Sequence, residues 1–290
     1  MNSNKDTVGL GWRPDLAAGI LDHLEQIDVV EVIADDYYGA SRKKIRALQT
    51  LASQVPVTLH GIGMGLASAS RAEDRYLHHM SSLVECIGPQ TWSEHLAFVR
   101  ADGIELGHLA APPRTTATID GASENVYRAA RIVGAKPLVE NIATLLDPPG
   151  SVFSESAWIS GILQSSGCGL LLDLHNIYAN GFNHGYDPRD FLQQIPAASI
   201  SAIHIAGGKF ISAPDGTLRL LDDHFHDVPD PIFDLLEQVA ALTLNPLTVI
   251  LERDGDYPSM SSLLTQISHA RAAMARGRAR RAAVSSEVAA

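Results

Sequence analysis

The amino-acid sequence predicts an α/β fold in which eight parallel strands and eight helices alternate and close into a (β/α)8 barrel of the TIM type. Three observations support this class. Short, apolar, β-branched-rich runs recur eight times along the chain, segments with helical periodicity separate them, and 290 residues suit a fold that uses roughly 250 residues as one domain. The runs are continuous rather than alternating, which is typical of parallel strands covered on both faces.

The expected elements follow one another in a regular order. The strands are expected at residues 8–11, 29–34, 57–61, 92–98, 137–141, 169–174, 202–206 and 248–252. The helices are expected at residues 14–26, 42–54, 73–86, 122–133, 155–165, 188–194, 231–241 and 259–276. Eight strand–helix units favour a closed barrel over an open doubly wound sheet. The chain also lacks the GxGxxG and GxxxxGK[ST] loops of nucleotide-binding sheets.

Three further stretches fall outside this pattern. Residues 101–117 and 207–228 are too long for simple strand-to-helix turns, and we expect long functional loops there. Residues 277–290 mix arginine with small residues and have no apolar period. We therefore expect one barrel domain over residues 1–276 and a disordered, solvated tail over residues 277–290.

Composition and charge exclude several classes of protein. A hydrophobic content of 46% with 19% charged residues supports a large core and excludes wholesale disorder. No apolar run reaches the roughly 20 residues of a membrane span, and the amino terminus has no signal-peptide-like stretch, so we expect a soluble cytoplasmic protein. Two distant cysteines argue against a disulfide framework or a thiolate zinc site. A net charge of −11 argues against nucleic-acid binding.

Metal-ligand side chains stand at or near the carboxyl ends of most expected strands. They are His60, Glu94, His95, Glu140, Asn141, Asp173, His175, Asn176, His204 and Glu252. In a barrel these strand ends converge on one face, so the side chains become neighbours in space. Imidazole and carboxylate without thiolate suit iron, manganese or zinc, and the set exceeds what one ion can use. Each residue alone also fits a hydrogen-bonded core position, but burying Glu140, Asp173 and Glu252 together without cations would cost several kcal/mol per charge.

The stretch 222–227 (DDHFHD) adds further candidate ligands after the seventh strand. Asp222 and His224 would point the same way in an extended segment, because side chains two residues apart share a face. The choices between the two aspartates at 222–223 and between His224 and His226 depend on register and stay open. His184 belongs to a Gly/Asn-rich turn, where we expect a structural role. We assign no chemistry to the other histidines, which are His23, His78, His79, His108 and His269.

Several segments, in this order, carry a resemblance to a known family. They are VGLGWRP (8–14), LHGIGMGL (59–66), SEHLAF (93–98), LVEN (138–141), LLLDLHNIY (170–178), GFNHGYDP (181–188), IHIAG (203–207), DDHFHDVPDPIF (222–233) and ILERD (250–254). At these residues the sequence resembles the multinuclear non-heme iron-dependent oxidases, the family that includes the iron enzyme of methanobactin biosynthesis.

The resemblance implies a xylose-isomerase-like TIM barrel with two or three irons in mixed Fe(II)/Fe(III) states. It implies an enzyme that uses O₂ to modify a ribosomally made precursor peptide, typically at cysteine, with a small leader-peptide-recognition protein as partner and no nucleic acid or membrane. Carried over, one iron would use His60, His95 and Glu140, a second would use Glu140, Asp173, His204 and Glu252, and a third would use Asn141, His175, Asp222 and His224. Glu140, Asp173 and Glu252 would be the catalytic residues. Many relatives carry asparagine where this chain has His175.

Two other functions remain open from the residues alone. A divalent-metal sugar isomerase or phosphodiesterase on the same barrel would also gather His, Asp and Glu, and it would work with zinc or magnesium and without O₂. A non-enzymatic subunit could bind metal or peptide without turnover. The sequence of the enzyme does not identify its substrate, so neither the peptide nor the product can be predicted from it.

Overall fold

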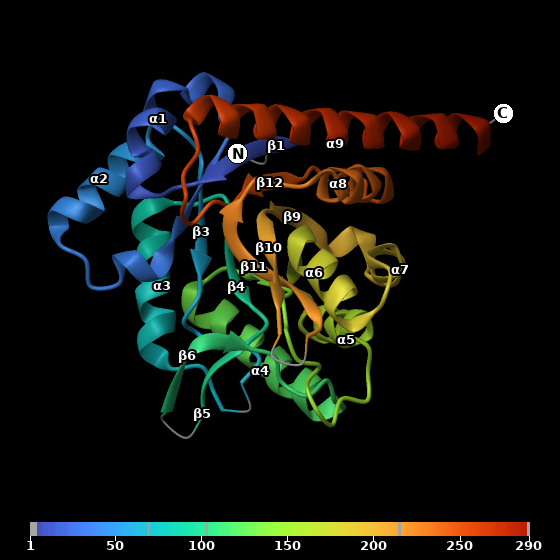
Figure 1. The fold of residues 1–290 in the computed structure, drawn as a ribbon. Coiled ribbons are helices and arrows are strands. Elements are labelled where there is room, and N and C mark those ends of the chain that lie inside the picture. Colours follow the sequence, from blue (N-terminus) through green and yellow to red (C-terminus); the bar gives the residue numbers. More distant parts are fainter. Residues whose placement is uncertain (1–4, 69, 102–103, 214–215, 289–290) are drawn as a thin grey trace.

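Eight strands form a closed parallel barrel in the computed structural model, which describes residues 5–68, 70–101, 104–213 and 216–288 (Figure 1). The barrel strands are β1 (Thr7–Gly11), β2 (Val30–Ile33), β3 (Val57–Gly61), β4 (Trp92–His95), β7 (Leu138–Glu140), β8 (Gly169–Asp173), β9 (Ile200–Ile205) and β12 (Thr248–Leu251). Each overlaps one of the expected runs, so the predicted fold class is confirmed. Residues 1–4, part of the amino terminus interpreted above, lie outside the described residues.

The helices lie between the strands and cover the outside of the barrel (Figure 1). They are α1 (Ala17–Asp22), α2 (Arg42–Ala52), α3 (Asp74–Ile87), α4 (Thr116–Val133), α5 (Glu155–Ser166), α6 (Leu174–His184), α7 (Pro188–Gln194), α8 (Asp230–Leu242) and α9 (Met260–Val288), with short 3-10 turns η1 (Pro14–Leu16), η2 (Leu24–Gln26), η3 (Ala34–Tyr37) and η4 (Ala197–Ser199). Local capping sets several ends. Ser41 accepts a hydrogen bond from the Lys44 amide, and Thr115 forms a capping box with Thr118. Within the described ranges, no helix has the length and apolar character needed to cross a membrane.

Helix α6 is the main element that the sequence pattern does not predict. It begins immediately after β8, and its carboxyl end is Gly185, whose φ of 77° lies in the left-handed region. Asp173 caps the helix by accepting a hydrogen bond from the Asn176 amide at 2.7 Å. His, Asn and Gly are weak helix formers, so burial against the barrel, not propensity, explains this helix. His175 and Asn176 therefore occupy its first turn.

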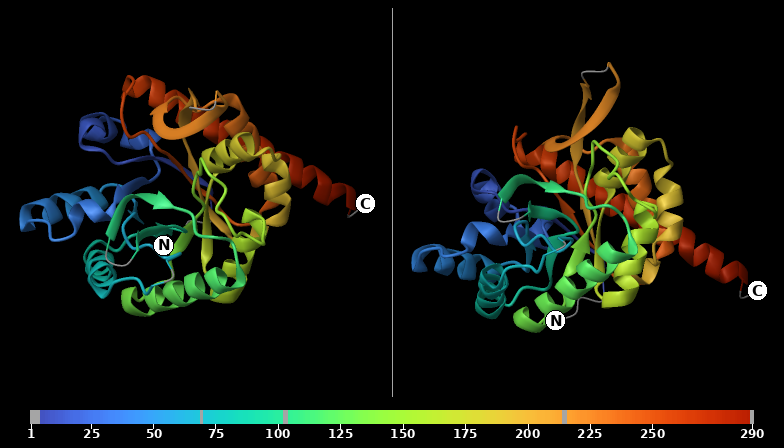
Figure 2. Two further views of the ribbon diagram at one scale, coloured as in Figure 1. Left: turned by 60° about the horizontal axis from the view of Figure 1, so that its bottom comes forward. Right: turned by 90° about the horizontal axis from the view of Figure 1, so that it is seen from below.

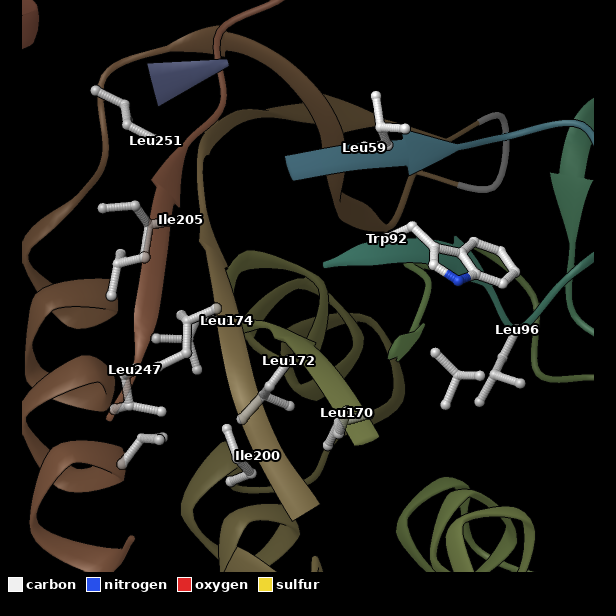
Figure 3. Close-up of a cluster of buried hydrophobic side chains, with 14 of the residues drawn as sticks. Leu59, Trp92, Leu96, Leu170, Leu172, Leu174, Ile200, Ile205, Leu247 and Leu251 are labelled. Carbon is white, nitrogen blue, oxygen red and sulfur yellow. The ribbon is translucent and has the colours of Figure 1, made fainter. Parts of the chain in front are cut away.

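The two faces of the barrel strands pack into separate cores. Leu170 and Leu172 of β8 join the large cluster between the strands and the helices (Figure 3), whereas Leu171 packs in a small cluster with Leu138 and Ala202. Since successive strand residues point to opposite faces, Leu171 belongs to the barrel interior. Two residues after Leu138, Leu171 and Ala202 come Glu140, Asp173 and His204. The barrel interior is thus apolar at the level of Leu138, Leu171 and Ala202 and polar at the carboxyl ends of the strands.

Two antiparallel hairpins replace the expected long loops. The first pairs β5 (Phe98–Ala101) with β6 (Ile104–Ala110), and the second pairs β10 (Gly207–Ser212) with β11 (Leu218–His226). The second extends away from the barrel (Figure 2). Asn183 of α6 anchors it by accepting from the Leu220 amide at 2.8 Å and donating to the Leu220 carbonyl at 2.9 Å. Residues 102–103 and 214–215 lie outside the described residues.

The end of the chain differs from the expected disordered tail. Helix α9 continues to Val288 and reaches beyond the barrel (Figure 1). Its arginines pair with carboxylate and carbonyl acceptors: Arg278 bonds Asp6 at 2.7 Å, and Arg276 bonds the buried carboxylate of Glu237 at 2.6 Å. These long-range contacts hold residues 277–281 in place. The sequence has no apolar period over these residues from which the helix could be predicted. Residues 289–290 of the expected tail lie outside the described part of the chain.

Candidate metal centre

Three neighbouring strands bring His60, His95 and Glu140 together inside the barrel mouth. The register pairs His95 with Glu140, whereas His60 pairs with Ser93, two residues before His95. The Nε2 atoms of His60 and His95 both lie 3.4 Å from the same oxygen, Oε2 of Glu140. That oxygen is buried and has no hydrogen-bond partner among the described residues. A cation between the three side chains would satisfy it.

A second group shares Glu140 with three further side chains. Glu140, Asp173, His204 and Glu252 each offer a ligand atom, and these atoms lie within 4.8 Å of one another. Nδ1 of His204 is 3.1 Å from Glu140 and 3.0 Å from Glu252. All four residues are buried. Together with His60 and His95 they form what we call the inner cluster.

Neighbouring groups hold the imidazoles of the inner cluster from behind. Nδ1 of His60 bonds the Ser93 hydroxyl at 2.8 Å, which leaves Nε2 facing Glu140. Nε2 of His204 lies 2.8 Å from the carboxylate of Glu31, which leaves Nδ1 facing Glu140 and Glu252. Metal-binding histidines commonly have such a partner on the far nitrogen. Glu31 was missed by the sequence analysis, although a single glutamate inside the apolar run 29–34 is a visible signal.

Charge in the inner cluster is unbalanced without cations. Burial, reinforced by Asp222, Glu140 and Glu252, raises the pKa of Asp173 well above its usual value. Burial opposes protonation of His95, but Glu140 and Glu94 outweigh it and raise its pKa to about 9. Repulsion among the carboxylates and a raised pKa at His95 are expected of a ligand set considered without positive ions.

Four residues outside the barrel strands form a second assembly, the outer cluster: His175, Asn176, Asp222 and His224. Oδ1 of Asp222 lies 2.6 Å from Nδ1 of His175 and 2.9 Å from Nε2 of His224. His224 has a φ of 55°, a left-handed conformation that costs a non-glycine residue energy and commonly marks a functional site. Asp222 and His224 line the central cavity.

The structure separates the open pairs of candidates in the stretch 222–227. Asp223 and His226 bond each other at 2.9 Å, and neither lines the cavity that contains Asp222 and His224. His184, at the end of α6, contacts the Thr144 hydroxyl at 2.9 Å. His108, to which the sequence analysis gave no chemistry, does line the cavity.

Asn141 does not join the outer cluster. Its Oδ1 accepts from the Asp173 amide at 2.9 Å and its Nδ2 donates to the Asp173 carbonyl at 3.0 Å, so both polar atoms serve the backbone. Asn176 takes the place expected for it: it lines the cavity, and its buried Oδ1 has no partner within the described ranges. His175 lies behind Asp222 and outside the cavity lining. Because α6 begins at Leu174, Asn176 lies in its first turn and lines the cavity, whereas Asn141 does not.

Both clusters open into a cavity of about 860 Å³. Metal-ligand side chains and aliphatic side chains such as Ile62, Leu109, Leu145 and Leu146 both line it. Leu146 is 81% exposed, so the apolar wall continues to the protein surface. Such a site can hold metal ions beside an organic substrate of limited polarity.

The fold and the site define a TIM-barrel protein with a buried constellation of metal-ligand side chains at the carboxyl ends of its strands. The chain belongs to the MbnB/TglH/ChrH family of RiPP precursor modification enzymes, whose family model matches residues 7–275. It is therefore an enzyme that acts on a ribosomally made precursor peptide.

Individual relatives agree with this assignment. The chain is 34% identical to a UPF0276 protein of Streptomyces avermitilis over 263 residues, which cover 88% of this chain and 52% of that protein, so it spans about half of that relative. It is 30% identical to a UPF0276 protein of Caulobacter vibrioides over 274 residues, covering 94% of this chain and 96% of the relative.

Solved structures share the fold at low sequence identity. An L-ribulose 3-epimerase superposes with a TM-score of 0.61 at 13% identity, with 98% of each chain covered. Endonuclease IV from Thermus thermophilus gives 0.59 at 14% identity, covering 92% of this chain and 98% of that one. A xylose isomerase-like TIM barrel protein from Mycobacterium smegmatis gives 0.57 at 12% identity, covering 92% and 97%. These likenesses establish a xylose-isomerase-like barrel and leave the chemistry to the site.

Proposed function

We propose that the protein is an iron-dependent oxidase that uses O₂ to modify a cysteine-containing precursor peptide. The observation that supports it most is Glu140, whose two carboxylate oxygens face two separate ligand groups. His60 and His95 approach one oxygen, and His204 approaches the other at 3.1 Å. A carboxylate in this position suits a bridge between two ions, and nitrogen and oxygen donors without thiolate suit iron.

The ligand sets follow from this bridge. One iron would use His60, His95 and Glu140, and a second would use Glu140, Asp173, His204 and Glu252. For a third iron, the unpartnered Asn176 oxygen with Asp222 and His224 fits better than a set containing Asn141. Bound iron supplies the electron transfer to O₂ and the acidification of a substrate thiol that no side chain provides.

The chain's own residues supply orientation and exclusion of water. The Ser93 hydroxyl bonds the imidazole of His60, the Glu31 carboxylate lies 2.8 Å from that of His204, and the aliphatic cavity lining would shield the reacting peptide segment from solvent. Cys86 and Cys168 are outside the cavity lining, and the chain has no nucleotide-binding loop. The metal centre is thus the redox agent that the described residues favour.

The decisive experiment uses iron-loaded protein and a cysteine-containing precursor peptide, with and without the small recognition protein that we propose as partner. We expect more than one iron per chain by elemental analysis and a peptide mass change that requires O₂. A Cys→Ser peptide should stay unmodified. Product formation without any oxidant would overturn the oxidase and favour the isomerase or hydrolase alternative, and exclusive zinc would overturn the iron assignment.

A further inference from the structure

Arg13 belongs to the opening motif at residues 8–14, which has no part in either metal cluster. It follows β1 at the carboxyl end of the barrel and lines the cavity, and its side chain is 13% exposed. Of the described residues that line this cavity, it is the only arginine or lysine. A fixed cation at this place can act on whatever occupies the cavity.

The Arg13 guanidinium is held rigidly by its neighbours. Nε and Nη2 both donate to Oδ1 of Asp254, at 2.9 and 2.5 Å, and Nη1 donates to the Trp12 carbonyl at 3.0 Å. Gly11 leaves room for the group, because a Cβ there would lie 3.2 Å from Nη1. A side chain fixed in this way loses little entropy when it binds a ligand.

Two donors of Arg13 remain unused. A guanidinium carries five N–H groups, and the bonds to Asp254 and Trp12 use three of them. For the other two, the described part of the chain provides no acceptor. Polar groups on a largely buried side chain are normally satisfied, so the missing acceptor points to a ligand in the cavity or to water.

The charge balance selects the kind of acceptor. Asp254 already neutralises Arg13, and its other oxygen lies 3.2 Å from Nδ1 of His224. Adding a carboxylate would leave a net negative charge here, whereas a neutral oxygen would not. A peptide that enters the cavity brings such oxygens as backbone carbonyls, which need donors once water is excluded.

We propose that Arg13 binds a backbone carbonyl of the precursor peptide near the reacting residue and so positions that residue at the metal centre. The inference rests on the proposed function only in taking a peptide as the occupant of this cavity. Arg13 is thus a substrate-binding residue, fixed in place by Asp254.

The test measures peptide binding, separately from turnover. The iron-loaded protein is titrated by calorimetry, without O₂, with the same cysteine-containing precursor peptide. We expect Arg13→Gln to weaken binding by about tenfold to a hundredfold, because a charge-assisted hydrogen bond is lost. Arg13→Lys keeps the charge without the planar fork and should weaken binding by about threefold or more. The control Arg271→Gln changes an arginine paired with Asp28 near the other end of β1 and should bind like the unchanged protein.

Four outcomes separate the possibilities. Binding within twofold of the unchanged protein for Arg13→Gln, with folding intact by circular dichroism, overturns the inference. Loss of iron in parallel with binding also overturns it, because Arg13 would then act through Asp254 and His224. If replacing the acidic side chains of the peptide by amides abolishes the effect of Arg13→Gln, the acceptor is a carboxylate and the carbonyl assignment fails. Peptide binding that depends on Arg13 but leads to no oxidation supports the inference and refutes the proposed oxidase.

Discussion

The inner and outer clusters are built from the same residue types but on different supports. The inner ligands stand on or directly after parallel barrel strands, and the side chains of His204 and Glu140 are 0% and 2% exposed. Asp222 and His224 stand on a two-stranded hairpin, with side chains 18% and 15% exposed. Strands bonded on both sides hold ligands rigidly, whereas the hairpin depends on a few anchors. We therefore expect substitutions of inner-cluster ligands to abolish peptide modification. Substitutions of outer-cluster ligands should reduce it only in part.

The largest effect is expected from Glu140→Gln, which removes the carboxylate shared by both inner ligand groups. Peptide modification should fall below about one hundredth of the original rate, since even indirect changes at metal sites cost 10- to 100-fold. His175→Asn should retain most activity, because His175 only contacts Asp222 from behind. Mass spectrometry of the peptide gives the rates. Equal loss in both variants would contradict the division into two clusters.

Removal of metal should destabilise the protein through the inner cluster. A ligand present at 100 times its dissociation constant stabilises the folded state by about 2.7 kcal/mol, and the carboxylates of Glu140, Asp173 and Glu252 repel one another without cations. Thermal unfolding with and without a chelator, at neutral pH, measures the change in Tm. Adding ferrous iron should restore it. A Tm unaffected by chelation would mean that the inner cluster holds no structural ion.

A smaller and more specific effect separates Asn176 from Asn141. Asn176→Ala should lose one iron per chain and keep the inner irons. Asn141→Ala should keep the iron count but lower the free energy of unfolding by about 1–3 kcal/mol, because it removes the side-chain hydrogen bonds to the buried backbone amide and carbonyl of Asp173. Elemental analysis and urea unfolding measure the two quantities. The opposite pattern would restore Asn141 as the ligand.

The smallest change in composition, Gly208→Ala, replaces none of the candidate ligand residues. A Cβ at this position would lie 2.2 Å from the Leu221 carbonyl oxygen and 2.6 Å from Cε1 of His175, so the hairpin must shift. We expect about 1–3 kcal/mol of destabilisation and weaker binding of the outer iron alone. Gly121→Ala is the control, since the nearest atom to its new Cβ is 3.8 Å away. If Gly208→Ala binds outer iron normally, the hairpin does not govern that site.

The sequence alone determined the barrel and its inner cluster. Eight apolar runs predict eight buried parallel strands. Because the carboxyl ends of barrel strands converge, the position of a metal-ligand residue at the end of a run can also be predicted. The sequence is enough to expect the following six side chains at the barrel mouth: His60, His95, Glu140, Asp173, His204 and Glu252. Their positions depend on the alternation of side chains along each strand and on closure of the barrel, and both can be predicted from the local sequence pattern.

Only the tertiary structure decided the outer cluster, Glu31 and Arg13. A helix start one residue earlier or later turns side chains by about 100°, so the position of Asn176 at the cavity depends on where α6 begins. In the hairpin, a slip of one residue would exchange Asp222 for Asp223, and the register is fixed from outside by Asn183. Contacts between residues far apart in the chain determine these positions, and such contacts cannot be predicted from local sequence patterns.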